Sequence, residues 1–238
     1  MQVDYIKNCD CIDGIREIPD KSIDCIIADP PYGIDYQSAR RTDKEKRLPK
    51  IKNDKAPYVW FLHDASRVLK DTGCIYVFCR WDTQDAFKQA MDWAGIHARS
   101  CIVWDRQVHG MGDLKKQFAP THDNILFAAK HGFCFPAKRP KDVIQQMRIP
   151  GQKLLHPNEK PVELIKELIK SSTNEENVIL DPFMGSGSTA VACKQTGRHY
   201  IGFELDAGYC SIAQDRARDA LGLLQTQEQI GLVGEGQR

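Results

Sequence analysis

The sequence lacks a long apolar run. No stretch approaches the ~18 consecutive apolar residues that suggest a membrane-spanning helix. The first ten residues, MQVDYIKNCD, also lack the apolar centre of a secretory signal peptide. These two absences argue against a membrane protein and a secreted one, so we expect a cytoplasmic protein in a reducing compartment.

Paired cysteines are absent as well. Nine cysteines are scattered along the chain, none stands in a C-x-x-C pair, and the seven histidines do not cluster near a cysteine pair. An odd number of separated cysteines fits free thiols better than a disulfide framework, and the spacing does not match the common zinc sites. We therefore expect no metal.

A strong net charge is the third absence. The formal charge is +1, so the composition as a whole gives no basic character that would point to nucleic acid. The charge is locally uneven, because residues 40–55 hold eight Lys or Arg against three acids, and residues 130–153 hold six against one. Such runs are usually solvated loops, and they become phosphate-facing patches only if the chemistry between them concerns nucleic acid.

Apolar runs alternate with helical patterns along the chain, which predicts an α/β fold. The expected strands are 2–9, 23–29, 74–79, 100–104, 124–130, 177–183 and 199–205, and the expected helices are 60–70, 82–94, one from 161, one ending near 197, and 207–221. This order favours a doubly wound, mostly parallel sheet of seven strands, in which a long hairpin makes one strand antiparallel.

We expect a single domain over residues 1–221. Mobile loops are expected at about 33–55 and 130–155, and a flexible tail at 222–238. The sequence shows no internal repeat and no second core.

A glycine-rich turn, LDPFMGSGST at 180–189, links a predicted strand to a predicted helix. Gly185 and Gly187 allow close backbone approach to a ligand, and the N–H groups at the helix start attract a negative group. A phosphate-binding P-loop is disfavoured, because the lysine before its final Ser or Thr is missing. The spacing through Ala190, with Glu204 at the next strand end, suits NAD, and it equally suits S-adenosylmethionine.

The stretch IDCIIADPPYG at 23–33 ends a buried-looking strand with an acid, two prolines and a tyrosine. Pro30 and Pro31 cannot continue a sheet ladder, and they hold a carbonyl in a fixed direction beside the Asp29 carboxylate. Two such acceptors suit an –NH2 group, and Tyr32 offers a flat face to a heterocycle. Asp-Pro alone is an ordinary strand stop, but the full pattern indicates a holder for an exocyclic amine on an aromatic base.

Asp-Pro-Pro-Tyr at 29–32 together with Asp-Pro-Phe-Met-Gly-Ser-Gly-Ser-Thr at 181–189 resembles the beta class of DNA amino-methyltransferases. These enzymes transfer a methyl group from S-adenosylmethionine to N6 of adenine or N4 of cytosine. The catalytic motif comes first and the cofactor turn last, so the resemblance implies a circularly permuted Rossmann-like methyltransferase fold. It covers roughly residues 4–215.

The resemblance implies S-adenosyl-L-methionine as cofactor and double-stranded DNA as partner, in a restriction-modification setting of a bacterial or bacteriophage type. The resemblance also suggests a homodimer, because dimers are common in the family. Asp-Pro-Pro-Tyr favours adenine, because cytosine-N4 enzymes more often begin the motif with Ser. The base is expected to flip out of the duplex and stack on Tyr32.

The resemblance also assigns candidate residues. The catalytic set is Asp29, Pro30, Pro31 and Tyr32. The cofactor-binding set is Asp10, Cys11, Asp29, Lys160, Asp181, Phe183, Gly185, Ser186, Gly187, Ser188, Thr189, Glu204, Leu205 and Tyr209. Lys160, within His-Pro-Asn-Glu-Lys-Pro, is the expected partner of the cofactor carboxylate. The expected DNA contacts are Arg40, Arg41, Arg47, His122, Lys138 and Arg139.

One departure and several alternatives stay open. The family's target-recognition region usually precedes the His-Pro element, and here only residues 130–155 are available. Either recognition is compact and shared with the 34–55 loop, or the specificity is short or relaxed. The alternatives are a cytosine-N4 methyltransferase, an NAD-dependent oxidoreductase, a non-catalytic DNA-binding module, and an enzyme acting on RNA or protein glutamine.

Overall fold

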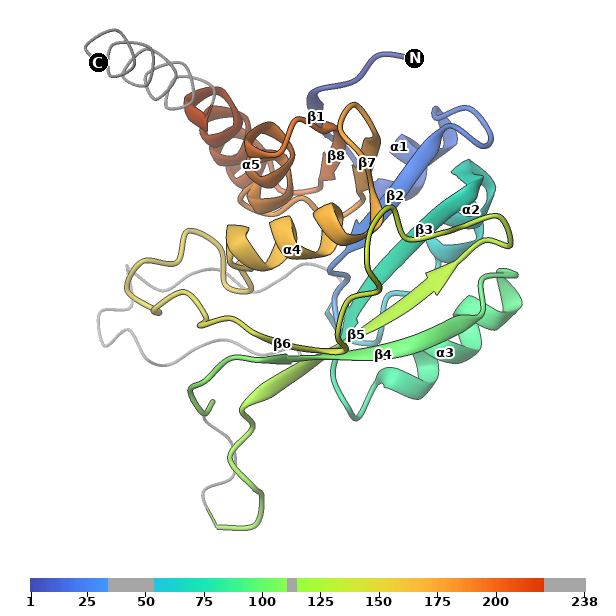
Figure 1. Cartoon of the computed structure of the whole chain (residues 1–238). Helices are drawn as coiled ribbons and strands as arrows, with labels where there is room; N and C mark the ends of the chain where they lie inside the picture. The colour runs from blue at the N-terminus through green and yellow to red at the C-terminus, as the bar shows by residue number, and fades with distance from the viewer. Residues whose placement is uncertain (34–53, 111–114, 221–238) are drawn as a thin grey trace, which may run out of the picture.

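One eight-stranded sheet organises the molecule, of which the computed structural model describes residues 1–33, 54–110 and 115–220 (Figure 1). The strands are β1 Tyr5–Asn8, β2 Ile23–Ala28, β3 Leu69–Cys79, β4 Ala98–Asp105, β5 His122–Ala129, β6 Val143–Gln145, β7 Val178–Asp181 and β8 His199–Glu204. Their order is β1-β8-β7-β2-β3-β5-β4-β6, and every neighbouring pair is parallel except the two that β5 makes. The predicted doubly wound sheet with one antiparallel strand is confirmed.

The predicted number of seven strands is wrong, because β6 adds an eighth. This strand has only three residues, of which Ile144 alone is buried, and it pairs with the end of β4 from Val103 to Asp105. A run this short shows no alternation that could identify it in the sequence.

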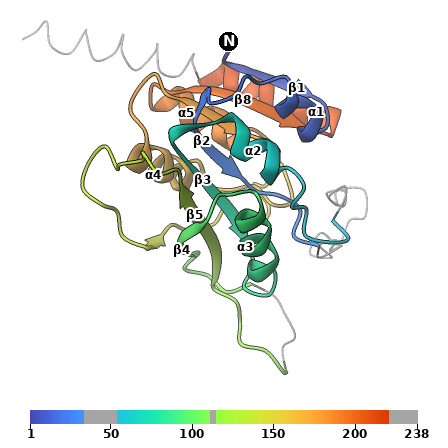
Figure 2. The same ribbon diagram turned by 90° about the vertical axis from the view of Figure 1, so that its right-hand side faces the viewer.

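Helices cover both faces of the sheet. They are α1 Cys11–Arg16, α2 Leu62–Val68, α3 Gln84–Trp93, α4 Val162–Ser172 and α5 Ser188–Gln195, and a further helix runs over 207–220 to the limit of the described residues. Figures 1 and 2 show α1, α2 and α3 on one face and α4 and α5 on the other. The expected helix over 60–70 is shorter than predicted, because β3 begins at Leu69.

The strand that ends in Asp-Pro-Pro-Tyr lies in the middle of the sheet. β2 is flanked by β3 and β7, and all its residues except Asp24 are buried. The predicted apolar side of α4 is buried as well, including Leu164, Leu168 and Ile169. Because each such side chain contributes about 1.5–3 kcal/mol on burial, β2 is firmly held and carries Asp29 at a fixed place.

The nine cysteines are free thiols, as their number and spacing predict. No helix within the described ranges is long and apolar enough to cross a membrane. Among the described residues, no group of three or more His, Cys, Asp or Glu is placed to hold a metal ion. The predicted tail from 222 and most of the predicted loop at 33–55, including Arg40, Arg41 and Arg47, lie outside the described residues.

Candidate active site

A cavity of about 210 Å³ opens at the carboxyl ends of β1, β2, β7 and β8. Ligands of doubly wound sheets bind at this edge, where the chain turns from strand to helix. The cavity is lined by all the predicted catalytic residues and by all the predicted cofactor-binding residues except Gly187. The structure therefore brings together segments that are about 150 residues apart in the sequence.

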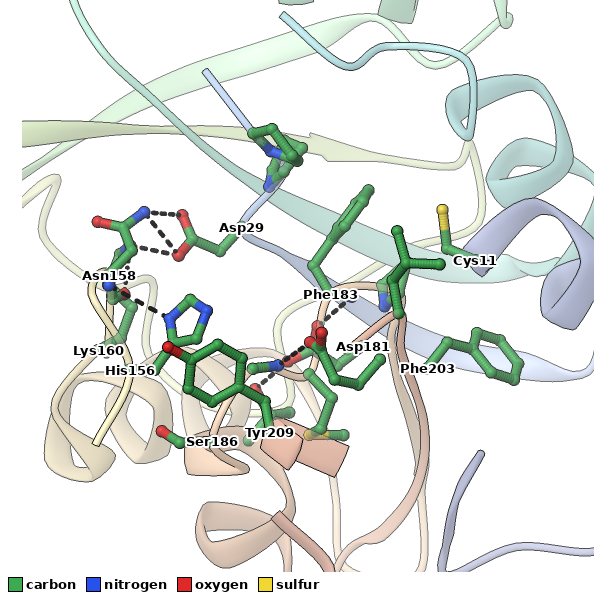
Figure 3. Close-up of a pocket in the computed structure, with 18 of the residues that line it drawn as sticks. Cys11, Asp29, His156, Asn158, Lys160, Asp181, Phe183, Ser186, Phe203 and Tyr209 are labelled. Carbon is green, nitrogen blue, oxygen red and sulfur yellow. Dashed lines mark hydrogen bonds and ion pairs between the residues drawn. The ribbon is translucent and has the colours of Figure 1, made fainter. Parts of the chain in front are cut away.

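Three side chains donate to the Asp29 carboxylate. Lys160 Nζ lies 2.5 Å from Oδ2, Asn158 Nδ2 lies 3.2 Å from the same oxygen, and the Tyr32 hydroxyl donates to Oδ1. Figure 3 shows Asn158 and Lys160 on the same side of Asp29, at one end of the cavity. Asp29 is thus an acceptor whose direction is fixed by donors of its own chain.

The two prolines that follow Asp29 differ in what their carbonyls accept. The Pro31 carbonyl accepts a hydrogen bond from the Tyr58 backbone N–H at 3.0 Å. The Pro30 carbonyl accepts none from any described residue. Pro30 therefore presents a free acceptor next to Asp29, as expected for a pair of acceptors that holds an –NH2 group.

Tyr32 lines the cavity with a side chain that is only 6% exposed. Burial raises the pKa of its hydroxyl well above the usual value of 10.0, and the negative charge of Asp29 adds to this effect. Lys160 Nζ lies 5.7 Å from the centre of the ring. The ring is therefore held at two places, by the hydrogen bond to Asp29 and by the lysine.

The glycine-rich turn begins α5 with backbone conformations that favour glycine. Gly185 has φ +54° and Gly187 has φ +91°, and a Cβ on Gly187 would lie 2.9 Å from Ala213 Cα. Gly187 is the N-cap residue of α5, and no side chain caps this helix end. The N–H groups of the first turn thus face the cavity edge with their partial positive charge.

Asp181 accepts hydrogen bonds from two residues of the glycine-rich turn. Its Oδ1 accepts from the Phe183 backbone N–H at 2.9 Å, and its Oδ2 accepts from the Thr189 hydroxyl at 2.5 Å. Burial raises the pKa of this carboxyl to about 7, although both hydrogen bonds act against the shift. The predicted residues Asp181, Phe183 and Thr189 therefore shape the wall of the cavity.

Glu204 stands at the end of β8 and supports the same turn. Its Oε2 accepts from the Gly185 N–H at 2.8 Å, and its Oε1 accepts from the Asp206 N–H at 2.8 Å. Burial raises the pKa of Glu204, and the two hydrogen bonds lower it. A carboxylate offers about four acceptor positions, so Glu204 can also accept from a pair of ligand hydroxyls.

Asp10 and Cys11 lie where β1 passes into α1. The Asp10 side chain is the N-cap of this helix and accepts from the Ile12 N–H at 2.8 Å. Cys11 is buried, and burial raises the pKa of its thiol to about 12. Figure 3 shows Cys11 and Phe203 at the end of the cavity away from Asp29. This end is apolar, as a flat heterocycle requires.

Sequence reasoning did not single out Asn158, Glu159 or Arg216, although the first two lie in the motif it quoted. Arg216, on the last described helix, donates to the Ser186 carbonyl at 2.7 Å and pairs with Glu159 at 2.9 Å. It thereby ties the glycine-rich turn to the His-Pro segment. Only the fold reveals this connection, because a single arginine on a helix carries no signal in the sequence.

His156 is the partly buried histidine of that segment. Burial, followed by the positive charge of Lys160, lowers the pKa of its imidazole to about 4. Its Nδ1 accepts from the Asn158 N–H at 3.2 Å, and its ring meets Tyr209 edge-on with centroids 4.5 Å apart. His156 therefore lines the cavity as an uncharged side chain. Tyr209, one of the predicted cofactor-binding residues, packs against its ring.

The described DNA-contact candidates are all exposed, but they do not lie together. His122 begins β5 and pairs with Asp105, at the same edge of the sheet as Asp29. Lys138 and Arg139 precede β6, on the segment that crosses the face of the sheet in Figure 1. β6 begins opposite Val103, two residues before β4 ends. Lys138 and Arg139 precede β6, so they do not reach the sheet edge at which His122 lies.

The cavity fits S-adenosylmethionine on three observations. The Ser188 hydroxyl is buried at the start of α5 and has no hydrogen-bond partner among the described residues. This orphaned donor and the α5 N–H groups suit a carboxylate. Glu204 suits ribose hydroxyls, and the apolar end near Cys11 suits an adenine ring.

Comparison with known proteins gives a consistent picture. The DNA methylase family model, which covers N6 and N4 methyltransferases, matches residues 23–215. The type II methyltransferase M.HinfI of Haemophilus influenzae is 28% identical over 88% of this chain and 67% of its own. YubD of Escherichia coli (strain K12), named as a putative methylase, is 32% identical over 87% of each chain.

Solved structures share the fold. The M1.HpyAVI–SAM complex is 22% identical and has a TM-score of 0.67, with 89% of this chain and 98% of that chain covered. The cytosine-N4-specific PvuII DNA methyltransferase is 16% identical with a TM-score of 0.70, and the match covers 93% and 92% of the two chains.

Proposed function

This chain belongs to the DNA methylase family of N6 and N4 amino-methyltransferases, and we propose that its own target is N6 of adenine in double-stranded DNA. The methyl donor of this family is S-adenosylmethionine. Family membership argues against the NAD-dependent oxidoreductase that the glycine spacing alone left open. It also favours DNA over RNA or a protein as the substrate.

The observation that carries the proposal is the pair of acceptors at the end of β2. The Asp29 carboxylate and the free Pro30 carbonyl are neighbours at one end of the cavity, and both are fixed by the buried strand before them. An exocyclic amine has two hydrogens to donate, so it can bind both acceptors at once. An acid in the first position of this motif favours adenine over cytosine, by resemblance to the family.

The two acceptors would also prepare the amine for reaction. The lone pair of such an amine is delocalised into the ring, and hydrogen bonds from both its hydrogens hold the nitrogen closer to tetrahedral geometry. Positive charge then develops on nitrogen, and Asp29 and the Pro30 carbonyl stabilise it with no reorganisation. Asp29 is also the base nearest to the proton that the amine loses.

The residues around the cavity would hold the methyl donor, which supplies an electrophilic sulfonium methyl when it is bound. We assign the Ser188 hydroxyl and the α5 N–H groups to its carboxylate, with Lys160 close by. Glu204 would accept from its ribose hydroxyls, and the segment at Asp10 and Cys11 would flank its adenine. Orientation of both reactants supplies much of the rate in such a transfer.

The target nitrogen is inaccessible inside a duplex, so the base must be extruded into the cavity. The ring of Tyr32, which lines the cavity, would stack on it. The proposed phosphate contacts are Arg40, Arg41 and Arg47, which lie outside the described residues, and His122 at the edge of the sheet. Lys138 and Arg139 would contact DNA farther from the extruded base.

The experiment is to incubate the purified protein with mixed-sequence duplex DNA and S-adenosylmethionine, digest the DNA to nucleosides and separate them by mass. We expect N6-methyl-2′-deoxyadenosine with the wild type and none with Asp29→Ala. N4-methyl-2′-deoxycytidine instead would support a cytosine-N4 methyltransferase, the second candidate, whose fold is represented by a cytosine-N4-specific enzyme. Absence of any methylated nucleoside, with cofactor binding intact, would contradict the proposal.

A further inference from the structure

The loop between β4 and β5 presents an aromatic side chain that the site above does not use. Phe118 is 101% exposed, the highest value among the large apolar side chains of the described residues. A phenylalanine in this position gains nothing from the fold, because its ring makes none of the contacts that stabilise a buried aromatic. Its full apolar area is therefore available to a partner.

The base of this loop is held by hydrogen bonds. The Arg106 N–H donates to the Thr121 carbonyl at 2.9 Å, and the Gly110 N–H donates to the Pro120 carbonyl at 2.7 Å. The Arg106 guanidinium also donates to the Pro120 carbonyl at 2.8 Å. These bonds tie the two sides of the loop together as far as Pro120, and Phe118 stands two residues farther out. We call residues 106–110 and 115–121 the arm.

The arm rises from the same edge of the sheet as the catalytic motif. β4 runs in the direction of β2 and β3 and ends at Asp105, where it pairs with His122 at the start of β5. Figure 1 shows the arm extending well beyond the sheet at this end. Arg106 pairs with Asp123 at 3.5 Å, and the charge of Asp123 contributes to the raised pKa of Tyr32. The foot of the arm therefore stands at the edge of the sheet where β2 and the catalytic motif end.

The chemistry of the tip suits a DNA duplex. Lys115 and Lys116, both exposed, stand three and two residues before Phe118. Cations beside an exposed ring match a surface on which phosphates flank stacked bases. Extrusion of a base breaks the stack at one step, and proteins that distort DNA often place an apolar side chain between bases at such a step.

We propose that Phe118 inserts into the base stack of the DNA beside the extruded target base, with Lys115 and Lys116 on the neighbouring phosphates. The inserted ring replaces the stacking that the departing base gave up and so favours the extruded state. This inference rests on the proposed function for base extrusion, but it does not depend on which base is methylated.

The test uses a fluorescent duplex that carries the sequence context methylated by the wild-type protein, with 2-aminopurine at the target position. Wild type, Phe118→Ala, Phe118→Trp and Trp93→Ala are compared for duplex affinity and for the rise in 2-aminopurine fluorescence on extrusion. Trp93 is the matched control, because it is 79% exposed at the far end of α3. No variant changes a residue that lines the cavity.

We expect Phe118→Ala to lower the extruded fraction and the duplex affinity together by about 5- to 100-fold, the range for loss of one base–aromatic stack. Phe118→Trp should retain most of both, and Trp93→Ala should match the wild type. A duplex with an abasic site opposite the target should reduce the loss, because its target base is already unpaired.

Equal extrusion by Phe118→Ala and Trp93→Ala would overturn the proposal. A second result would also overturn it. If Phe118→Ala changes the oligomeric state in gel filtration, and its extrusion defect disappears when oligomer concentrations are matched, the ring binds a second copy of the chain instead of DNA. Asp29→Asn separates this test from the proposed catalysis. It should still bind and extrude the base, so loss of methylation alone says nothing against Phe118.

Discussion

Lys160 Nζ lies 2.5 Å from Asp29 Oδ2, and the two side chains are 7% and 17% exposed. The sequence predicts Lys160 as a partner of the cofactor carboxylate, and the structure adds a carboxylate of the protein itself. The same ammonium also lies 3.2 Å from the Asn158 carbonyl and 3.4 Å from the Tyr32 hydroxyl, so its three N–H donors all have partners within the protein. The same relationship makes Asp29 part of the fold as well as of the proposed chemistry.

Removal of Asp29 should therefore have two separable effects. Asp29→Ala should abolish methyl transfer, and it should also destabilise the fold by about 2–4 kcal/mol, because Lys160 is left charged and nearly buried. The double variant Asp29→Ala, Lys160→Met should recover most of the stability but no activity. Urea unfolding and a methyl-transfer assay on the same preparations measure the two effects. Activity in the double variant would refute the role of Asp29.

Tyr32 should act mainly through its ring. Tyr32→Phe removes the hydroxyl that donates to Asp29 but keeps the flat face, so we expect only a few-fold loss of activity. Tyr32→Ala removes the stacking surface and should cost about 5- to 100-fold, the range for one base–aromatic contact. Steady-state kinetics on duplex DNA compare the variants. Equal losses would show that the hydroxyl, and not stacking, is what matters.

Arg216 should position the cofactor-binding turn without touching the reacting atoms. Arg216→Met breaks its contacts with Ser186 and Glu159, so we expect the affinity for S-adenosylmethionine to fall about tenfold, as for loss of hydrogen bonds to a charged group. Calorimetric titration measures this. Arg218→Met, on the same helix, is the control, because its pair with Asp215 is 74% and 60% exposed. Equal affinities in both variants would contradict the positioning role.

His156 should make stability depend on pH below neutrality. Its folded pKa is about 4 against an ordinary value of 6.5. Between these values the unfolded chain binds a proton that the folded chain does not, so this contribution is fully present above pH 6.5 and is lost as the pH falls toward 4. The free energy of unfolding of wild type and His156→Phe is measured in urea at pH 7.5, 6 and 5. The difference in favour of the wild type should become smaller each time the pH is lowered.

His199 provides a control of opposite sign. Hydrogen bonds to Asp4, and then to Glu176, raise its pKa, so its contribution is present below pH 6.5 and is lost as the pH rises through the folded value. His199→Gln should therefore lose most stability in acid. If His156→Phe shows the same pH dependence as His199→Gln, His156 is not held in its neutral form by the fold.

The fold was largely predictable, because burial leaves a clear pattern in the sequence. β2 is buried on both faces and reads as a continuous apolar run, and the apolar side of α4 recurs at helical spacing. α1 was missed because it has only six residues and contains Gly14. That glycine serves packing, since a Cβ there would lie 2.5 Å from the Phe203 ring.

The site was predictable in its residues but not in their pairings. Asp29, Tyr32 and the glycines stand in motifs whose order identifies them. The bond from Asn158 to Asp29 joins residues 129 apart, and Arg216 reaches Ser186 from a helix 30 residues away. Such contacts depend on how the strands are ordered in the sheet, and a single sequence does not encode them as a local pattern.

Adenine methylation that depends on Asp29 is tested most directly by long-read sequencing of DNA from cells that express the wild-type chain or Asp29→Ala, since it reports the modified base and its sequence context together. We expect N6-methyladenine in one defined context with the wild type, and unmodified DNA with the variant. N4-methylcytosine, or the same modification with Asp29→Ala, would contradict it.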